Sequence, residues 1–278
     1  MKNSVLSFLV FSIFSLLSFG QQKEFKVEII GTGAPVLLFP GFSCTSEVWE
    51  ETVSNLKDQY ECHIFTFAGF GDVPPIETPW LPKIKEAVEN YVVEKNLNEP
   101  TIVGHSLGGT LGLWLASDQP NFYKKLIVVD GLPSVGALMI PNFKSEDISY
   151  DNPYSKQQLA MDDVSFRAMA SQYASFMSLN KEKHQQLTDW MVAADRKTYV
   201  HGYTDLLKLD LRNAIAKIQI PVIVLAATYP NKEMVKSNYE KQFAKLPSAK
   251  IFYADDSAHF IMFDQPSWFL EQLNQSLK

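Results

Sequence analysis

A serine framed by glycines is the first feature of this chain whose residue types and spacing suggest chemistry. Residues 101–109 read TIVGHSLGG, which places Gly104 and Gly108 two positions on either side of Ser106. A serine at a sharp turn from strand to helix has a strained backbone that pushes its hydroxyl outward, and glycines there remove the Cβ atoms that would collide. The apolar run 110–117 after the turn is compatible with a buried helix. The segment predicts a nucleophilic serine.

A histidine near the end of the chain is the best candidate for the base that such a serine needs. A serine hydroxyl is a poor nucleophile until a neighbouring imidazole takes its proton. His259 stands in the segment AHFIMFDQP. The chain has four other histidines: His63, His105, His184 and His201. One falls on an expected strand, one beside the serine and two in a polar helical region, so we expect packing or surface roles for all four.

An aspartate at the end of an apolar strand is the preferred partner for the imidazole. Residues 126–131 read LIVVDG, and Asp130 closes the apolar run. The carboxyl end of a parallel strand faces the site in open α/β sheets, but an aspartate there is equally able to cap a loop. Three other acids are candidates. Glu233 is better placed to open a helix, and Asp255 and Asp256 better suit a turn.

Together these segments resemble the α/β-hydrolase fold family, over nearly everything after residue 24. Residues 36–42, VLLFPGF, look like the strand and loop that supply the oxyanion hole in that family, although Pro40 stands where many relatives have histidine. The resemblance implies the backbone N–H groups of Phe42 and Leu107 as the two donors. Two N–H dipoles fixed where negative charge develops lower the barrier by about 3 to 4 kcal/mol each.

The resemblance also orders the catalytic groups, because the family places its serine first and its histidine last. In the family, the commonest site for the acid follows the strand that corresponds to residues 221–226, but the sequence after residue 226 has no acidic residue before Glu233. Some members carry the acid one strand earlier. The resemblance therefore implies Ser106 as nucleophile, Asp130 as the acid and His259 as the base.

The elements that must position these groups follow from alternating signals along the chain. Seven apolar runs predict strands and are separated mostly by helical stretches, which indicates a largely parallel sheet. The runs are 25–30, 36–39, 62–67, 101–103, 126–129, 222–226 and 250–253. With the resemblance, we expect an α/β fold with a mostly parallel eight-stranded sheet flanked by helices, in a core of residues 21–132 and 214–278.

Residues 133–213 show no convincing strand, and we expect them to form a helical cap inserted after the sixth strand. Apolar side chains recur there at helix spacing: Phe166, Met169, Tyr173 and Phe176, then Leu187, Trp190, Met191 and Ala194. Such stripes are usually packing surfaces, so we expect a minority of them to line the substrate pocket. The segment directly after Asp130 is the leading candidate for the pocket wall. The substrate-binding residues expected there are Leu132, Val135, Leu138 and Met139.

Composition limits the partners. The chain of 278 residues is 46% hydrophobic and carries a formal charge of −6. Without a clustered basic stretch, this charge argues against nucleic acid or an anionic membrane as the main partner. No dinucleotide-binding glycine pattern, phosphate-binding loop or metal-ligand spacing is present, so we expect no cofactor and no metal. The expected partner is a small apolar ester, and the oligomeric state stays open.

The N-terminal segment 1–20 predicts a secretory signal peptide, with Lys2 ahead of an apolar run and small residues at the cleavage point. Cleavage is preferred to a retained anchor, since a membrane span needs about 20 strongly apolar residues. We therefore expect a periplasmic or secreted protein with no stable membrane insertion. Cys44 and Cys62 are expected at opposite ends of the sheet. A disulfide needs Cα atoms within about 7 Å, so we predict two free thiols.

The preferred interpretation is a serine hydrolase that cleaves a carboxylic ester of an apolar acyl group through an acyl-enzyme. Related activities use the same constellation, and the sequence does not choose among an esterase, a thioesterase, a lactonase and a carbon–carbon bond hydrolase. The alternative from another class is a non-catalytic protein that binds a hydrophobic small molecule on the same fold. The serine and histidine segments speak against that alternative, and the missing acid after residues 221–226 speaks weakly for it.

Overall fold

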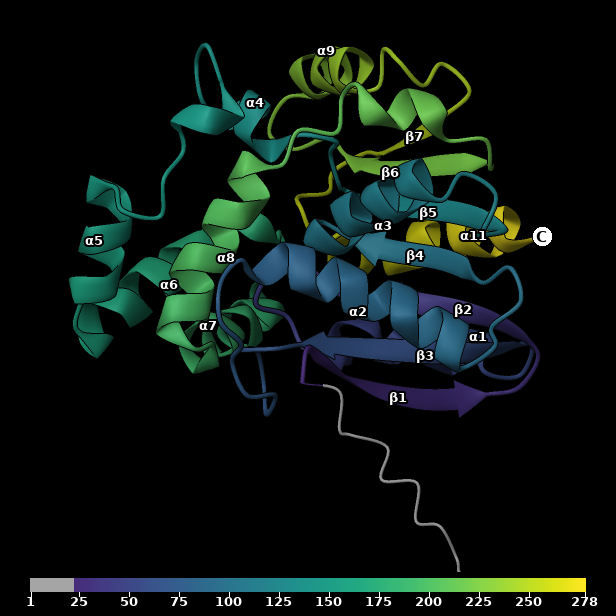
Figure 1. The fold of residues 1–278 in the computed structure, drawn as a ribbon, viewed down its shortest axis with the longest axis horizontal. Coiled ribbons are helices and arrows are strands. Elements are labelled where there is room, and N and C mark those ends of the chain that lie inside the picture. The colour runs from purple at the N-terminus through teal and green to yellow at the C-terminus, as the bar shows by residue number, and fades with distance from the viewer. Residues whose placement is uncertain (1–22) are drawn as a thin grey trace, which may run out of the picture.

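The computed structural model describes residues 23–278, and the predicted signal peptide lies outside the described residues. Within that part, seven strands form one sheet in the order β1-β3-β2-β4-β5-β6-β7 (Figure 1). They are β1 (Phe25–Gly31), β2 (Ala34–Phe39), β3 (Tyr60–Phe67), β4 (Thr101–His105), β5 (Lys125–Val129), β6 (Val222–Ala227) and β7 (Lys250–Ala254). β1 runs antiparallel to β3, and the other neighbouring pairs are parallel.

The expected count of eight strands is not what the described residues form, and the helical insertion follows the fifth strand instead of the sixth. Each of the seven apolar runs corresponds to one strand, whereas the eighth strand rested on the resemblance alone. Only Thr32 and Gly33 separate β1 from β2. Gly31 and Gly33 have φ angles of 92° and 127°. The chain therefore turns back at once and leaves no residues for a further strand between β1 and β2.

Helices cover both faces of the sheet, because successive side chains of a strand point to opposite faces. Leu37 and Phe39 of β2 pack in one core with α2, α3 and α9, whereas Val36 and Leu38 pack in a second core with α1 and α11. The helices of these layers are α1 (Glu50–Leu56), α2 (Trp80–Glu94), α3 (Leu107–Asp118), α9 (Lys232–Gln242), α10 (Ile261–Asp264) and α11 (Pro266–Leu277), with 3-10 turns at Ser46–Trp49 and Ala214–Lys217. Burial on both faces explains why the strands read as continuous apolar runs.

The segment between β5 and β6 contains helices and no strand. The helices are α4 (Val135–Met139), α5 (Pro153–Ala160), α6 (Asp163–Met177), α7 (His184–Ala193) and α8 (Arg196–Lys208), with 3-10 turns at Ser145–Asp147 and Lys181–Lys183. Asn152, Asp162 and Asp195 accept a hydrogen bond from a backbone N–H in the first turn of α5, α6 and α8. Such caps fix where each helix begins. In Figure 1, α5 to α8 lie beyond the carboxyl ends of the parallel strands, at the left.

A buried carboxylate ties this insertion to the rest of the fold. Asp205 of α8 accepts hydrogen bonds from the backbone N–H groups of Trp80 at 2.6 Å and Leu81 at 3.1 Å. These are the first residues of α2, so Asp205 caps that helix, where a negative charge is favourable. The hydroxyl of Tyr150 donates to the second oxygen of the same carboxylate. The insertion is thereby held above the strand ends.

Both cysteines are buried and carry free thiols, as predicted. Cys44 lies beyond the carboxyl end of β2, and Cys62 lies near the start of β3. Burial raises the pKa of the Cys62 thiol to about 11 and holds the pKa of the Cys44 thiol well above its usual range. Both thiols therefore stay protonated at neutral pH. Within residues 23–278, no helix has the length and hydropathy to cross a membrane.

Candidate active site

Ser106 lies in the turn between β4 and α3, with φ 52° and ψ −116°. A non-glycine residue in this region carries backbone strain. Its backbone N–H donates to the carbonyl oxygen of Val129 at 2.8 Å, which ties the turn to β5. A Cβ atom at Gly104 would lie 2.2 Å from the Gly108 carbonyl oxygen, and one at Gly108 would lie 2.3 Å from the Phe39 carbonyl oxygen. The two glycines are therefore required by close backbone contacts that hold the serine in its turn.

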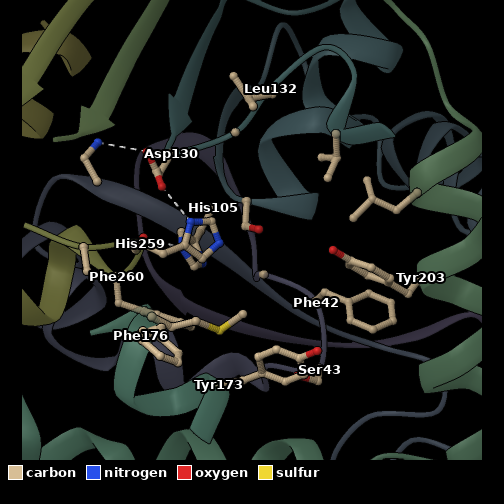
Figure 2. A pocket seen from close by; sticks show the side chains of 18 of the residues that line it. Phe42, Ser43, His105, Asp130, Leu132, Tyr173, Phe176, Tyr203, His259 and Phe260 are labelled. Carbon is tan, nitrogen blue, oxygen red and sulfur yellow. Dashed lines mark hydrogen bonds and ion pairs between the residues drawn. The ribbon is translucent and has the colours of Figure 1, made fainter. Parts of the chain in front are cut away.

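Asp130 follows β5 directly and has a φ of 46°. Its Oδ2 accepts a hydrogen bond from His259 Nδ1 at 2.6 Å. Its Oδ1 accepts from the Ala227 N–H at 2.9 Å and from the Tyr239 hydroxyl at 2.8 Å. Because a carboxylate only accepts, Nδ1 of His259 carries the proton and Nε2 is free to accept one. Figure 2 shows the carboxylate bonded on two sides.

The loop that carries His259 is held at several points. Asp264 accepts from the Ala258 N–H at 2.8 Å and from the Ser178 hydroxyl at 2.6 Å. On the other side, His105 Nε2 lies 3.0 Å from the carbonyl oxygen of His259, and the two rings are 4.7 Å apart. Burial, and secondarily the charge of His259, hold the pKa of His105 well below its usual value. His105 is therefore a neutral donor that fixes the backbone beside His259.

The other candidate acids lie elsewhere. The side chain of Glu233 is 84% exposed and pairs with a lysine one turn further along α9. Asp255 pairs with a lysine at the surface, and Asp256 is exposed. Of the four acids considered, only Asp130 lines the cavity that also contains the serine and the histidine.

A cavity of about 580 Å³ joins Ser106, Asp130 and His259 to the helical insertion. The four expected substrate-binding residues Leu132, Val135, Leu138 and Met139 are all placed in its wall. Figure 2 shows Asp130, His105 and His259 at one side and Phe42 and Tyr203 at the other. The insertion therefore supplies much of the space in which a substrate would lie above the strand ends.

The two residues expected to donate from the backbone lie on either side of the serine turn. Leu107 is the first residue of α3, where an N–H group has no acceptor within the helix. Phe42 lines the cavity. A Cβ atom at the preceding Gly41 would lie 2.6 Å from His105 Nδ1 and 3.4 Å from the Ser106 Cβ. A glycine here lets the loop pack closely against the His105 ring, directly beside the serine.

The apolar stripes of the insertion line the cavity more fully than expected. Five of the eight side chains contribute to its wall, not a minority: Tyr173, Phe176, Leu187, Trp190 and Met191. α6 and α7 lie against each other, and the small residues Ala170 and Ala174 are fully buried there. Small residues at that contact leave the large ones free to face the cavity.

The cavity wall carries very little charge. Among the described residues that line it, Asp130 is the only carboxylate and none is a lysine or an arginine. The polar groups of its distal wall include the hydroxyls of Tyr199 and Tyr203, which contact the sulfur atoms of Met191 and Met139 at 3.9 and 3.3 Å. Residues 23–278 hold no cluster of three or more histidine, cysteine or acidic side chains suited to a metal ion. A largely apolar, uncharged molecule suits this space.

Sequence reasoning missed three residues that hold the site together: Tyr239, Asp264 and His105. His105 precedes the serine directly, and its position alone was a signal for a role beyond packing. Asp264 lies in the segment around His259, five residues after it. Tyr239 lies on a largely polar helix and offers no comparable signal, since its contact with Asp130 joins residues far apart in the chain.

Comparisons with known proteins agree with this geometry. Residues 36–272 match the model of the alpha/beta hydrolase family. The chain is 23% identical over 259 residues to 3-oxoadipate enol-lactonase 1 of Acinetobacter baylyi, covering 90% of this chain and 92% of that protein. It is 25% identical over 238 residues to a pimeloyl-[acyl-carrier protein] methyl ester esterase of Vibrio campbellii, covering 84% and 90%. The fold is similar to that of a hydrolase from Pseudomonas aeruginosa, with a TM-score of 0.76, 18% identity and coverage of 91% and 94%. The chain therefore belongs to the alpha/beta hydrolase family of enzymes.

Proposed function

We propose that this protein is a serine hydrolase that cleaves carboxylic esters of apolar acyl groups through an acyl-enzyme intermediate. One observation carries the proposal. The strained turn of Ser106 and the hydrogen-bonded pair of Asp130 and His259 open into the same largely apolar cavity. A hydroxyl, a neutral imidazole and a carboxylate in this order are the groups that acyl transfer needs.

In the proposed mechanism, Ser106 Oγ attacks the ester carbonyl carbon while His259 Nε2 takes the hydroxyl proton. The carbonyl electron pair moves onto oxygen, where the N–H groups of Phe42 and Leu107 stabilise the charge. The imidazolium then gives its proton to the departing alcohol and leaves the acyl group on the serine. A water molecule, deprotonated by the same imidazole, releases the acid. Asp130 keeps the imidazole in the required tautomer and stabilises its charged form.

The residues that line the cavity support the proposal that the acyl group is apolar. A carboxylate at the far end of an acyl chain would find no lysine or arginine among the described lining residues and would lose its hydration. Phe176, Leu187 and Trp190 instead offer apolar surface. The names of the two relatives, an enol-lactonase and a methyl ester esterase, support cleavage of an ester bond.

The insertion and the N-terminal segment complete the proposal. We assign residues 133–213 as a cap that shapes the acyl site, on the ground that its helices supply much of the lining. Residues 1–20 are assigned as a signal peptide on the sequence pattern alone. The mature protein then acts in the periplasm or outside the cell.

A fluorophosphonate probe tests the proposal directly, because it reacts with an activated serine. The wild type should be labelled and Ser106→Ala should not, and p-nitrophenyl esters of increasing acyl length should be hydrolysed only by the wild type. Matched thioesters and lactones of the same acyl group then rank the related activities. A folded wild type that neither reacts with the probe nor hydrolyses any ester would favour the non-catalytic binding protein instead.

A further inference from the structure

The surroundings of Asp130 carry a further inference, which rests on the proposed function. We propose that Tyr239 is a positioning residue: its hydroxyl fixes the Asp130 carboxylate in the orientation that His259 needs. It acts through Asp130 and does not itself take part in the reaction. The inference deepens the account of the site by explaining how an acid at the end of β5 reaches a histidine on a distant loop.

The contact is short and its geometry is restrained. The Tyr239 hydroxyl lies 2.8 Å from Asp130 Oδ1, and the side chain is only 5% exposed. Its ring stacks on Phe243 with centroids 6.1 Å apart and meets the edge of the Tyr253 ring at 6.4 Å. A ring held on two sides places its hydroxyl at one point. From there the hydroxyl donates to Oδ1 of Asp130, the carboxylate oxygen that does not bond to the histidine.

The hydroxyl is a donor under all ordinary conditions. Burial first, and then the charge of Asp130, hold the pKa of Tyr239 well above its usual value. The phenol therefore keeps its proton, and a carboxylate oxygen can only accept it. A hydrogen bond to a charged group is among the stronger ones in proteins. The bond from Tyr239 and the bond from the Ala227 N–H together occupy Oδ1, which leaves Oδ2 to His259.

The helix that bears Tyr239 is locked to the same turn by a second side chain. Gln242 lies one turn further along α9 and is buried. Its amide nitrogen donates to the Ser134 carbonyl oxygen at 2.8 Å, and its amide oxygen accepts from the Ser134 N–H at 3.1 Å. One face of α9 therefore holds the segment from Asp130 to Ser134 at both ends. The distance between the phenol and the carboxylate cannot drift without breaking this paired contact.

Tyr239→Phe isolates the effect, because it removes one oxygen atom and keeps the ring. The carboxylate is then held on Oδ1 by a single N–H group, so it turns more freely and its charge is less satisfied. We expect kcat/KM for a p-nitrophenyl ester to fall roughly ten-fold, the scale of one hydrogen bond to a charged group. Tyr253→Phe is the matched control, since Tyr253 touches the Tyr239 ring but does not line the cavity.

The pH profile separates positioning from general stability. A less satisfied carboxylate holds the imidazolium of His259 more tightly, so the acid limb of the kcat/KM profile should move to higher pH. Within residues 23–278, the titratable groups around His259 include Asp130 after β5, Tyr239 on α9, His105 on β4 and Asp264 on α10, whose carboxylate accepts from the adjacent Ala258 N–H. His105 stays neutral because its pKa is well below the usual value, and Tyr239 stays protonated. The acid limb therefore reports on His259.

The experiment compares the wild type, Tyr239→Phe and Tyr253→Phe in ester hydrolysis, fluorophosphonate labelling and histidine side-chain NMR signals followed against pH. A ten-fold loss with a displaced acid limb in Tyr239→Phe alone supports the inference. Wild-type kinetics and an unmoved profile in Tyr239→Phe overturn it, as does an equal change in Tyr253→Phe. If the wild type itself neither hydrolyses esters nor reacts with the probe, the proposed function fails. In that case the NMR titration still decides whether Tyr239 acts on the Asp130–His259 pair.

Discussion

Replacing Asp130 by asparagine changes the hydrogen-bonding pattern of the site with almost no change in volume. Oδ1 receives hydrogen bonds from the Ala227 N–H and the Tyr239 hydroxyl. The amide oxygen of an asparagine must therefore take that position, and its NH₂ group then faces His259 Nδ1, which lies 2.6 Å from Oδ2 in the wild type. A donor at that place requires Nδ1 to accept, which moves the proton to Nε2. The nitrogen that takes the proton of Ser106 in the proposed mechanism is then already occupied.

The loss of the productive tautomer sets the magnitude. We expect kcat of Asp130→Asn to fall by up to about 10⁴ at neutral pH, which corresponds to about 5 kcal/mol of barrier height. The assay is steady-state hydrolysis of a p-nitrophenyl ester between about pH 5 and pH 9, with circular dichroism to establish folding. Glu233→Gln is the matched control, because it removes an acid whose side chain is 84% exposed and does not line the cavity.

Two results refute this reasoning. A rate for Asp130→Asn within ten-fold of the wild type would mean that the carboxylate does not hold the tautomer. A loss in Glu233→Gln as large as the loss predicted for Asp130→Asn would move the role of the acid to Glu233.

Three further predictions follow from the buried groups of the structure. The pKa of His105 is held below its ordinary value of 6.5, so at acidic pH this side chain takes up a proton in the unfolded chain and not in the folded one. As the pH decreases from about 6.5, the free energy of unfolding should therefore decrease by up to about 1.4 kcal/mol per pH unit. Urea unfolding at several pH values should show a shallower dependence in His105→Gln, and equal slopes would contradict this. Gly108→Ala would put a Cβ atom 2.3 Å from the Phe39 carbonyl oxygen, so thermal unfolding should reveal a loss of more than about 2 kcal/mol, and an unchanged Tm would be evidence against a tight turn. Because Cys44 and Cys62 are buried, iodoacetamide should modify neither in the native protein and both in urea, which mass spectrometry reads directly; rapid modification of the native thiols would be the contrary result.

Local physics explains which parts of the site could be predicted from the sequence. The glycines beside Ser106 follow from the sterics of a single turn, and the apolar run before Asp130 marks a strand end without knowledge of the rest of the chain. The structure places both residues at the carboxyl edge of the sheet, where strand ends in open α/β sheets form ligand sites. All seven apolar runs form strands for the same reason, since a strand buried on both faces needs consecutive apolar residues.

Contacts between distant segments explain what the sequence could not supply. The phenol of Tyr239 meets Asp130 from a helix more than a hundred residues further along, and no periodicity encodes that meeting. The share of insertion side chains that face the cavity was underestimated, because helix spacing identifies an apolar face but not what lies opposite it. The strand count was wrong for a different reason, since the apolar runs indicated the seven strands that the described residues form and the eighth came from the resemblance alone.

Because the candidate acid, Asp130, follows β5, the loop after β6 does not have to supply a carboxylate to the site. From this part of the chain the carboxylate takes only the backbone N–H of Ala227, the last residue of β6, and any residue except proline provides that group. Tyr229 is 48% exposed and borders the cavity together with Pro230. We therefore expect exchange of the Tyr229 side chain to change which molecules fit the cavity, while both hydrogen bonds to Asp130 Oδ1 stay in place. The backbone of this loop has to be preserved in such exchanges, because the Tyr229 N–H donates to the Ser257 carbonyl oxygen at 2.9 Å, two residues before His259.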